Sequence, residues 1–282
     1  MTLQPIFNCH GKGFDLRKPL VMGIINLMPT SFSPIGRVNN VAEAVAYAKQ
    51  IVTAGADIID IGAEPTNAAC MESVITEAEE LAALLPVIKA LTNEIAVPIS
   101  VDTSRPGVME AVIAAGAHMI NDVRALRVPG ALTTAAALQV PICLMHMRFL
   151  RLPDSVAVQE ESSSTTTNVM DEIVEFLQQR ITACEAAGIK RDYLIVDPGI
   201  GAAHFGKSLA ENLMIVQQLS RLRILQLPIL VGISNKLFKG EPTEKRAAKN
   251  LSATLTAIKN GANIVRVHDV ETTVLAIKGA LD

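Results

Sequence analysis

Residues 115–122 read A-G-A-H-M-I-N-D and contain a complete turn from a helix into a strand. An alanine-rich segment ends on Gly116, a small residue follows, and an apolar run through Ile120 closes on two polar residues. The same device recurs at residues 54–57 (A-G-A-D) and 260–263 (N-G-A-N). Glycine suits the end of a helix because it adopts left-handed backbone angles at little cost. We therefore predict that helices end at Gly55, Gly116, Gly188 and Gly261.

Beyond this turn, short runs rich in Ile and Val alternate along the chain with longer segments of helical periodicity. Strands are predicted at residues 20–25, 58–61, 99–101, 119–120, 141–145, 193–196, 228–231 and 264–267. Helices are predicted at residues 40–54, 74–94, 106–115, 130–138, 168–187, 208–224, 243–260 and 270–280. Eight strand–helix units predict an α/β fold, the (β/α)8 TIM barrel. A doubly wound open sheet is the structural rival, but no G-x-G-x-x-G motif follows the first strand.

The barrel is predicted to span residues 20–282 as a single domain, preceded by a short N-terminal hairpin over residues 1–19. In the hairpin, two short segments with apolar residues flank H-G-K-G, an arrangement suited to a cap on the bottom of the barrel. Residues 148–168 are predicted to form one long surface loop that is disordered in part, because they include a run of serine and threonine.

The composition excludes several classes of function. The chain has 282 residues, of which 50% are hydrophobic, 19% charged and 3% aromatic, with a net charge of −3 and no tryptophan. Nucleic-acid binding needs basic surface or aromatic platforms, and a membrane span needs roughly 20 apolar residues in succession; neither is present in the sequence. Four scattered cysteines form no metal knuckle or disulfide framework, and the apolar run around Cys143 is typical of a buried, inert thiol. Since no signal peptide is evident, we expect a cytoplasmic protein that binds small molecules.

A polar or ionisable residue stands at the end of almost every predicted strand. These residues are Asn26, Asp60, Glu64, Asp102, Asn121, Asp122, His146, Asp197, Ser234, Lys236, Arg266 and His268. Taken singly, some have a simpler interpretation: Asp122, like Thr103 and Ser104, suits the cap of a turn, and His146 suits a buried histidine. Because the strands of such a barrel end at one face, where the active sites of this fold are built, the whole set predicts a site.

The residue types limit the chemistry of this site. No H-x-H or H-E-x-x-H motif is present, which disfavours a tightly held zinc ion, and no nucleophile elbow indicates a serine hydrolase. The amide of Asn121 and the carboxylates of Asp102 and Asp197 suit a flat heterocycle whose edge carries N–H donors. Positive charge suited to a phosphate or diphosphate comes from Lys236, Arg266 and His268. These residue types together predict a substrate that has a polar ring and a diphosphate.

Six segments carry a resemblance to a known family. They are residues 22–26 (M-G-I-I-N), 99–104 (I-S-V-D-T-S), 116–122 (G-A-H-M-I-N-D), 144–147 (L-M-H-M), 196–199 (V-D-P-G) and 266–269 (R-V-H-D). In this order and on these predicted strands they resemble the dihydropteroate synthases, from the first strand of the barrel to the C-terminus. Other pterin-binding barrels, such as the corrinoid methyltransferases, look less similar, especially in the fourth and sixth of these segments.

The resemblance implies a homodimeric transferase of folate biosynthesis. Enzymes of this family condense 6-hydroxymethyl-7,8-dihydropterin diphosphate with p-aminobenzoate to give 7,8-dihydropteroate and diphosphate, using Mg²⁺. By resemblance, catalysis is assigned to Asp102, Asp197 and Lys236, and pterin binding to Asp102, Asn121, Met145, Asp197 and Lys236. Diphosphate binding is assigned to Asn26, Thr66, Arg266 and His268, with the metal on Asn26, and p-aminobenzoate binding to Phe32, Phe205 and Lys236. Apolar residues on the last two helices suit either the dimer interface or, for most of them, packing on the barrel: Leu255, Ile258, Leu275 and Ile277.

The chain departs from the family's pattern in the loops expected to close over diphosphate and aminobenzoate. Met28 stands where the family has a hydroxyl residue, and Thr30 and Pro34 stand where it has carboxylates. Asn67 and Asn235 replace arginines, and Leu237 replaces a serine. The glycine-rich segment 199–207 is longer than the family's, with Phe205 suited to its aromatic position. Two hypotheses stay open: a working synthase with altered loops, or a pterin-binding paralogue with little synthase activity or a different acceptor.

Overall fold

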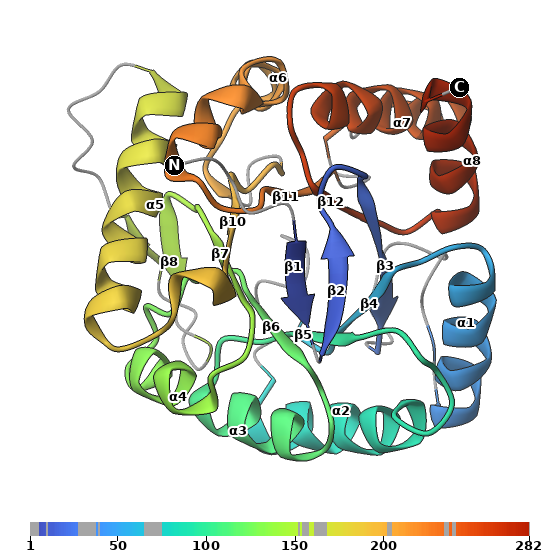
Figure 1. The fold of residues 1–282 in the computed structure, drawn as a ribbon, viewed down its shortest axis with the longest axis vertical. Coiled ribbons are helices and arrows are strands. Elements are labelled where there is room, and N and C mark those ends of the chain that lie inside the picture. Colours follow the sequence, from blue (N-terminus) through green and yellow to red (C-terminus); the bar gives the residue numbers. More distant parts are fainter. Residues whose placement is uncertain are drawn as a thin grey trace.

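Eight parallel strands form a barrel at the centre of the molecule (Figure 1). The computed structural model describes residues 6–9, 11–27, 38, 40–64, 75–151, 153, 158–160, 168–201, 205–233, 237–238 and 241–281. The barrel strands are β3 (Leu20–Asn26), β4 (Ile58–Gly62), β5 (Ile99–Asp102), β6 (Met119–Asp122), β7 (Ile142–Met145), β10 (Leu194–Asp197), β11 (Leu230–Gly232) and β12 (Ile264–Val267). They pair in the order β10-β7-β6-β5-β4-β3-β12-β11, and a parallel bridge between Val196 and Ile229 joins the two edges. The predicted (β/α)8 TIM barrel is confirmed.

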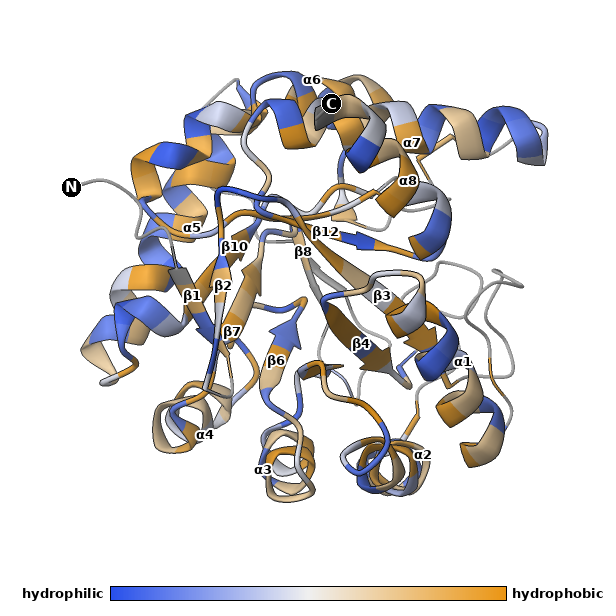
Figure 2. Cartoon of the chain, turned by 45° about the vertical axis from the view of Figure 1, so that its right-hand side comes forward, coloured by the Kyte–Doolittle hydropathy of each residue, from blue (hydrophilic) through white to orange (hydrophobic). Residues whose placement is uncertain are grey.

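A helix follows each of these strands on the outside of the barrel (Figure 1). The helices are α1 (Val41–Thr53), α2 (Glu77–Leu91), α3 (Pro106–Ala114), α4 (Ala131–Leu138), α5 (Val169–Ala186), α6 (Leu209–Gln217), α7 (Thr243–Lys259) and α8 (Val270–Leu281). Reciprocal capping boxes start two of them, Thr76 with Glu79 at α2 and Ser208 with Glu211 at α6. Figure 2 shows that β4 is mostly hydrophobic, whereas the surrounding helices carry both hydrophobic and hydrophilic residues.

The predicted helix over residues 208–224 is interrupted. Helix α6 ends at Gln217, and a 3-10 helix, η4 (Leu219–Leu225), continues the chain. Its leucines at 219, 222 and 225 are all buried. A spacing of three residues puts side chains on one side of a 3-10 helix, which has about three residues per turn. Burial of these leucines therefore favours the tighter helix over a longer α-helix.

The prediction that residues 148–168 form one long loop is wrong. Strands β8 (Phe149–Arg151) and β9 (Val158–Glu160) pair antiparallel within it. Pro153, between them, is buried, and its carbonyl accepts a hydrogen bond from the Arg105 guanidinium at 3.2 Å. Strand pairing satisfies backbone groups whatever the side chains are, so the polar composition of the segment did not indicate it. The serine and threonine run at 162–167 lies outside the described residues.

The predicted N-terminal hairpin is confirmed. Strands β1 (Ile6–Cys9) and β2 (Lys12–Asp15) pair antiparallel and lie over the centre of the barrel in Figure 1. The rings of Phe7 and Phe14 stack with their centroids 6.3 Å apart, and both are buried with Cys9 and Leu16. These four side chains pack in one cluster with residues from the amino-terminal part of the barrel strands, so the hairpin closes that end.

The barrel interior changes from apolar to polar along the strands. Residues two apart on a strand point to the same side of the sheet. The cluster beneath the hairpin contains Leu20, Met22, Ile58, Met119, Cys143, Ile195, Leu230 and Ile264. Two positions after five of these stand Asp60, Asn121, Met145, Asp197 and Arg266. Cys143 is fully buried, and burial raises the pKa of its thiol well above its usual value, which confirms the predicted inert thiol.

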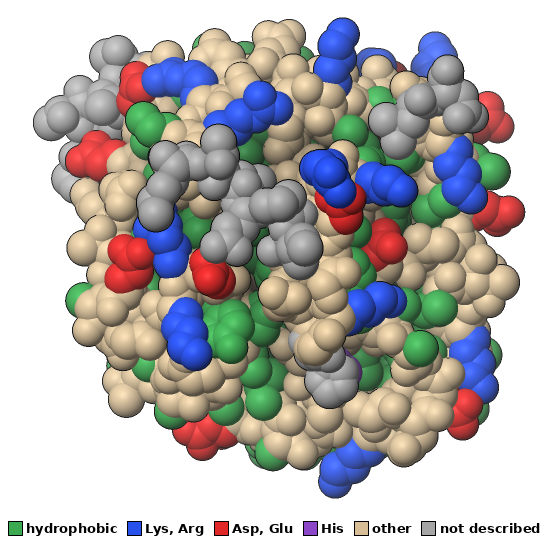
Figure 3. Space-filling view, in the orientation of Figure 1, with side chains coloured by type: hydrophobic (Ala, Val, Ile, Leu, Met, Phe, Trp, Pro, Cys, Tyr) green, Lys and Arg blue, Asp and Glu red, His purple; other side chains and the backbone are tan. Residues whose placement is uncertain are grey.

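On the face shown in Figure 3, basic and acidic side chains are interspersed, and neither charge predominates.

Within the described ranges, every helix is too short or too polar to traverse a lipid bilayer.

The four glycines predicted to end helices all have positive φ, of +107° at Gly55 and Gly116, +91° at Gly188 and +113° at Gly261. A Cβ added at Gly116 would lie 2.4 Å from Cγ2 of Thr92, whereas a Cβ at Gly188 would meet no described atom within 4 Å. We expect Gly188→Ala to lower the free energy of unfolding by about 1 kcal/mol, the backbone cost alone. Gly116→Ala should lower it by about 2–4 kcal/mol, because a steric clash is added. Urea unfolding measures both.

Thr92→Ser provides the control for this pair. It removes the clashing methyl group but keeps the hydroxyl that donates to the Lys89 carbonyl at 2.9 Å. The double variant Gly116→Ala/Thr92→Ser should therefore recover part of the stability lost in Gly116→Ala. Equal losses at Gly116 and Gly188 would contradict the clash.

Candidate active site

Residues from five strands lie together at the carboxyl-terminal end of the barrel, four of them from the neighbouring strands β5, β6, β7 and β10. Asp102 on β5 pairs in register with Asn121 on β6, and Asp197 on β10 pairs with Met145 on β7. Arg266 comes from β12 and contacts Asp102 directly. Because the strands surround one axis, side chains that point inward at similar heights lie close together. The barrel thus brings together five of the residues predicted for the site.

Asp60 on β4 connects several of these residues. Its carboxylate is fully buried, and Oδ2 accepts hydrogen bonds from Nε of Arg266 at 2.6 Å and from Nδ2 of Asn121 at 3.3 Å. Oδ1 accepts from the Ser100 hydroxyl at 2.6 Å. Nη2 of Arg266 also donates to Oδ2 of Asp102 at 3.1 Å. One guanidinium therefore lies between two carboxylates, and charge-assisted hydrogen bonds fix the positions of all three groups.

Burial raises the pKa values of the two predicted site aspartates, Asp102 and Asp197, toward neutral pH. It raises the pKa of Asp102 to about 7, an effect that the Arg266 guanidinium opposes and the Asp60 carboxylate reinforces. Burial also raises the pKa of Asp197 to about 6, opposed by a backbone N–H and by the charges of Lys207 and Arg266. A ligand that presents N–H donors or develops positive charge here would stabilise the ionised carboxylates.

The other predicted site residues lie at the edge of this group or outside the described residues. Asn26 is the last residue of β3, where its backbone pairs with Gly62, which pairs in turn with Asp102. His268 directly follows β12, and Phe205 lies in the turn before α6; both are half-buried. Outside the described residues lie Phe32, Thr66 and Lys236, together with Met28, Thr30, Pro34, Asn67 and Asn235. Leu237 is buried.

Two strand-end residues have the simpler, structural role. His146 is buried, with Nε2 3.3 Å from Oε1 of Glu172, and burial lowers its pKa to about 4, so its ring is neutral at pH 7. Asp122 accepts hydrogen bonds from the backbone N–H groups of Arg124 and Leu126 at 2.8 and 2.7 Å. The interpretations as a buried histidine and a turn cap are confirmed.

Asp60 and Glu64 belong to the strand-end set that predicts the site, but the sequence gives them no specific role, and it does not indicate Arg124 or Lys207. Arg124 donates to both oxygens of Glu64, at 2.9 and 2.6 Å, and to the Ser104 hydroxyl at 3.0 Å. It thereby joins the segments that follow β4, β5 and β6. An acidic residue inside an otherwise apolar strand was a signal for Asp60, whereas the partners of Arg124 and Lys207 are distant in the chain.

A metal ion in this site would depend on oxygen donors from the ligand. Among the residues that the structure describes, no three or more His, Cys, Asp or Glu side chains gather in a way suited to a metal. Asn26 offers one amide oxygen at the end of β3. Mg²⁺ usually keeps several waters and is bound by one or two carboxylates together with substrate phosphates. Asn26 would therefore hold a magnesium ion only together with oxygens from a diphosphate and water.

Asp60→Asn is predicted to destabilise the protein, because the partly buried Arg266 guanidinium loses the charge of one of its two carboxylate partners. We expect the free energy of unfolding to fall by about 2–3 kcal/mol. Ser100→Ala is the matched control, since it removes one neutral donor from the same carboxylate and should cost about 1 kcal/mol. Urea unfolding under mildly alkaline conditions measures both, and equal losses would contradict the importance of the ion pair.

Known proteins share both the sequence and the fold of this chain. A family model described as pterin binding enzyme matches residues 22–268. The dihydropteroate synthase of Escherichia coli (strain K12) is 40% identical over 274 residues, which cover 95% of this chain and 93% of that protein. The dihydropteroate synthase of Haemophilus influenzae is 37% identical over 268 residues, covering 94% of each.

Solved structures agree with these matches. Xanthomonas albilineans dihydropteroate synthase with 4-aminobenzoic acid is 41% identical, with a TM-score of 0.85 and coverage of 98% of this chain and 97% of that chain. The Yersinia pestis dihydropteroate synthase in a sulfonamide drug complex is 39% identical, with a TM-score of 0.87 and coverage of 98% of each chain.

The family model spans most of the barrel, and the relatives match nearly the whole chain at about 40% identity. The six motif segments that resemble this family lie on the barrel strands or next to them, and they carry Asp102, Asn121, Asp197 and Arg266 of the site. This chain therefore belongs to the pterin binding enzymes, within the family of the dihydropteroate synthases.

Proposed function

We propose that this protein is a transferase that joins 6-hydroxymethyl-7,8-dihydropterin diphosphate to p-aminobenzoate, giving 7,8-dihydropteroate and diphosphate. The observation that carries the proposal is the grouping of Asp102, Asn121, Asp197 and Arg266 at one end of the barrel. Relatives that are 41% identical are dihydropteroate synthases solved with 4-aminobenzoic acid and with 7,8-dihydropteroate. The same residue types suit both the ring and the diphosphate of the first substrate.

The pterin ring is proposed to bind at the ends of β5, β6, β7 and β10. The ionised carboxylate of Asp197 accepts hydrogen bonds from the 2-amino group and ring N3, since its two oxygens match two adjacent donors. Asn121 and Asp102 bind the opposite edge, and Met145 contributes apolar contact. Lys236 donates toward the carbonyl side of the ring.

The diphosphate is proposed to bind Arg266, His268, Thr66 and Asn26. Two of the five N–H groups of Arg266 donate to Asp60 and Asp102, and the others suit diphosphate oxygens. Asn26 would hold a magnesium ion, which when bound neutralises charge on the leaving diphosphate. The aminobenzoate is proposed to bind against Phe205 and Phe32, with Lys236 nearby.

The bond-forming step is a displacement at the pterin methylene carbon. The arylamine nitrogen forms a bond to this carbon, the carbon–oxygen bond breaks, and its electron pair leaves with the diphosphate; the nitrogen then loses a proton. Positive charge develops on the pterin as the leaving group departs. Asp102 stabilises this charge, because a carboxyl with a pKa of about 7 ionises readily beside a developing cation. The displacement requires no covalent enzyme intermediate.

A pterin-binding paralogue with little synthase activity or another acceptor is the alternative. It rests on the replaced loop residues, such as Asn67 and Asn235, which lie outside the described residues. Near-full-length identity of about 40% to several dihydropteroate synthases does not favour it.

The first test is diphosphate release by the purified protein with Mg²⁺ and the dihydropterin diphosphate, with and without p-aminobenzoate. We expect release to require the aminobenzoate. Asp197→Ala removes two charged hydrogen bonds to the pterin, so kcat/KM should fall by a factor of about 100 or more. No release, together with calorimetric binding of the pterin, would favour the paralogue over the synthase.

A cytoplasmic location is also proposed. Its support is that Cys9, Cys143 and Cys184 are free and buried in the described part of the chain, as is usual in a reducing compartment.

We further propose a homodimer formed through α6, α7 and α8, which pack side by side. Leu275 on α8 is 62% exposed, and Leu209, Leu213 and Met214 on α6 are also exposed. Ile277 is buried against the barrel, and Leu255 and Ile258 are half-buried. Exposed apolar residues on the two helices that flank α7 are typical of a protein–protein contact.

Sedimentation tests the dimer. The wild-type protein should sediment as a dimer, and Leu275→Glu should shift it toward monomer, because a charge in an apolar interface is desolvated without a partner. Ile224→Glu is the control, since Ile224 is equally apolar and more exposed but lies on η4. A monomeric wild type, or equal effects of the two variants, would contradict the proposed interface.

A further inference from the structure

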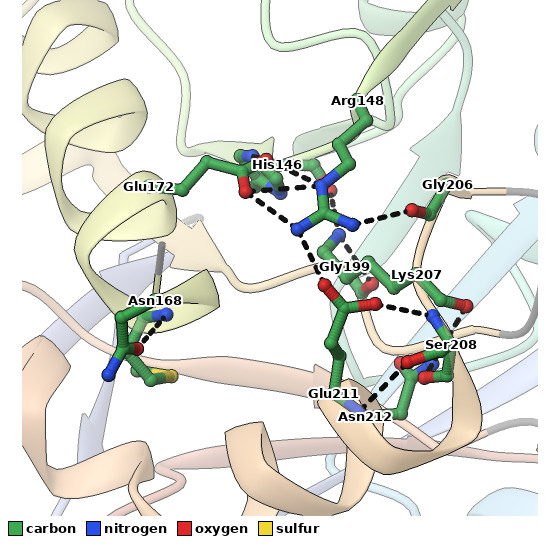
Figure 4. Close-up of polar contacts among 11 residues, drawn as sticks. His146, Arg148, Asn168, Glu172, Gly199, Gly206, Lys207, Ser208, Glu211 and Asn212 are labelled. Atoms are coloured by element: carbon green, nitrogen blue, oxygen red, sulfur yellow. Dashed lines mark hydrogen bonds and ion pairs between the residues drawn. The ribbon is translucent and has the colours of Figure 1, made fainter. Parts of the chain in front are cut away.

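Lys207 is a fully enclosed lysine directly before α6. Its side chain is among the largest fully buried ones in the described residues. Nζ donates to the backbone carbonyl of His146 at 3.1 Å and to that of Gly199 at 3.0 Å (Figure 4). His146 follows β7 and Gly199 follows β10, so one ammonium group joins the segments after two neighbouring strands.

The two residues that supply these carbonyls also bond Asp197, whose carboxylate is proposed to bind the pterin. The N–H of Gly199 donates to Oδ1 of Asp197 at 2.7 Å, and the N–H of His146 donates to the carbonyl of Asp197 at 2.9 Å. The packing is close, because a Cβ at position 199 would come within 1.9 Å of the His146 carbonyl oxygen. The orientation of Asp197 therefore depends on the backbone that Lys207 holds.

A second set of contacts holds the residues just before and after Lys207. Arg148 donates through its backbone N–H to the Phe205 carbonyl at 3.3 Å and through Nη1 to the Gly206 carbonyl at 2.8 Å. Its guanidinium also pairs with Glu172 on α5 and Glu211 on α6, each at 2.7 Å (Figure 4). Glu211 in turn caps the first turn of α6. The backbone around Lys207 is thus bonded to Arg148 in the segment after β7 and, through that guanidinium, to α5 and α6.

The charges around Lys207 come from several elements. Asp197 on β10, Glu172 on α5 and Glu211 on α6 raise its pKa, whereas burial and Arg148 lower it, with a net value of about 7. Reciprocally, the Lys207 charge lowers the pKa of Asp197, as does Arg266 on β12. His146 is neutral at pH 7. The positive charge of Lys207 therefore favours the ionised form of Asp197.

We propose that Lys207 is a positioning residue of the pterin site, which orients Asp197 by joining the ends of β7 and β10 and keeps its carboxylate ionised. This assignment rests on the proposed function, because it makes Asp197 the acceptor for the pterin's N–H donors. A protonated Asp197 would present an O–H to those donors. Pterin affinity should therefore fall as the pH drops through the pKa of Asp197, about 6.

Variants of Lys207 separate the two effects. Lys207→Met removes the hydrogen bonds, so pterin affinity should fall about tenfold at mildly alkaline pH, where Lys207, with a pKa of about 7, is mostly uncharged. It also removes the positive charge that Lys207 carries at lower pH, so the acid limb of binding should move to higher pH. Lys207→Arg keeps the charge and should restore the position of the acid limb. Lys207→Gln keeps N–H donors without charge, so its acid limb should stay shifted; it also serves if Lys207→Met does not fold.

The experiment is calorimetric titration of 6-hydroxymethyl-7,8-dihydropterin into each variant across neutral and acidic pH, with the melting temperature measured in parallel. Asn263→Ala is the control for lost stability. It removes hydrogen bonds to the Ile229 N–H (2.9 Å) and the Leu16 carbonyl (3.2 Å) at the opposite end of the barrel. It should lower the melting temperature and leave pterin affinity and its pH profile unchanged.

A second measurement keeps this proposal distinct from the proposed function. Carbon NMR of labelled aspartate, with the Asp197 signal assigned from Asp197→Asn, reports the pKa of Asp197 without any pterin. That pKa should rise in Lys207→Met and Lys207→Gln and return toward the wild-type value in Lys207→Arg. An unchanged pKa in the first two variants, or wild-type pterin binding by Lys207→Met, overturns the role of Lys207. A wild-type protein that binds no pterin overturns the proposed function instead.

Discussion

The alternation of inward and outward residues along parallel strands is the constraint on which this structure depends. In a barrel of this kind every second residue of a strand points inward, and the inward residues form successive layers along the barrel axis. Ile58 and Asp60 show the pattern, since they lie two residues apart on one strand. The apolar level packs with the hairpin and the next level forms the site. A shift of one residue in β4 would turn both Ile58 and Asp60 toward the helices. The apolar packing with the hairpin and the hydrogen bonds of the site would then both be lost.

Charges at the second level are tolerated because they are paired. Arg266 lies between Asp60 and Asp102, and Asn121 donates to the same Asp60 oxygen that Arg266 bonds. An unpaired buried charge would be far more costly than these shared hydrogen bonds. Burial nevertheless raises the pKa values of Asp102 and Asp197 to about 7 and about 6, because the charge of Arg266 offsets it only in part. A cationic or N–H-rich ligand would stabilise the ionised forms of both carboxylates.

The segment after β10, which the sequence predicts to be longer than the family's, has fixed ends. Gly199 on one side and residues 205–207 on the other are bonded to the segment after β7 and to each other. Lys207 and Arg148 make these bonds to backbone carbonyls, which do not depend on the side chains between them. The position of Phe205 is consequently set by its flanks, and the length of the intervening chain is free to differ.

Local rules account for what could be predicted from the residues alone. Gly116 ends a helix because of its own backbone freedom, and apolar runs such as residues 58–61 form strands because of their residue types. Asp102, Asn121, Asp197 and Arg266 could be assigned to one site, because parallel strands of a barrel all end at the same face. The 3-10 helix η4 could not, since it depends on the burial of its leucines in the core, and neither could the β8–β9 pair, since strand pairing satisfies backbone groups whatever the side chains are. The position of Arg266 between two carboxylates and the bonds from Lys207 to the backbone that contacts Asp197 could not be predicted either. Their partners are remote in sequence, and only burial in the folded barrel makes charge pairing strong enough to fix positions and shift pKa values.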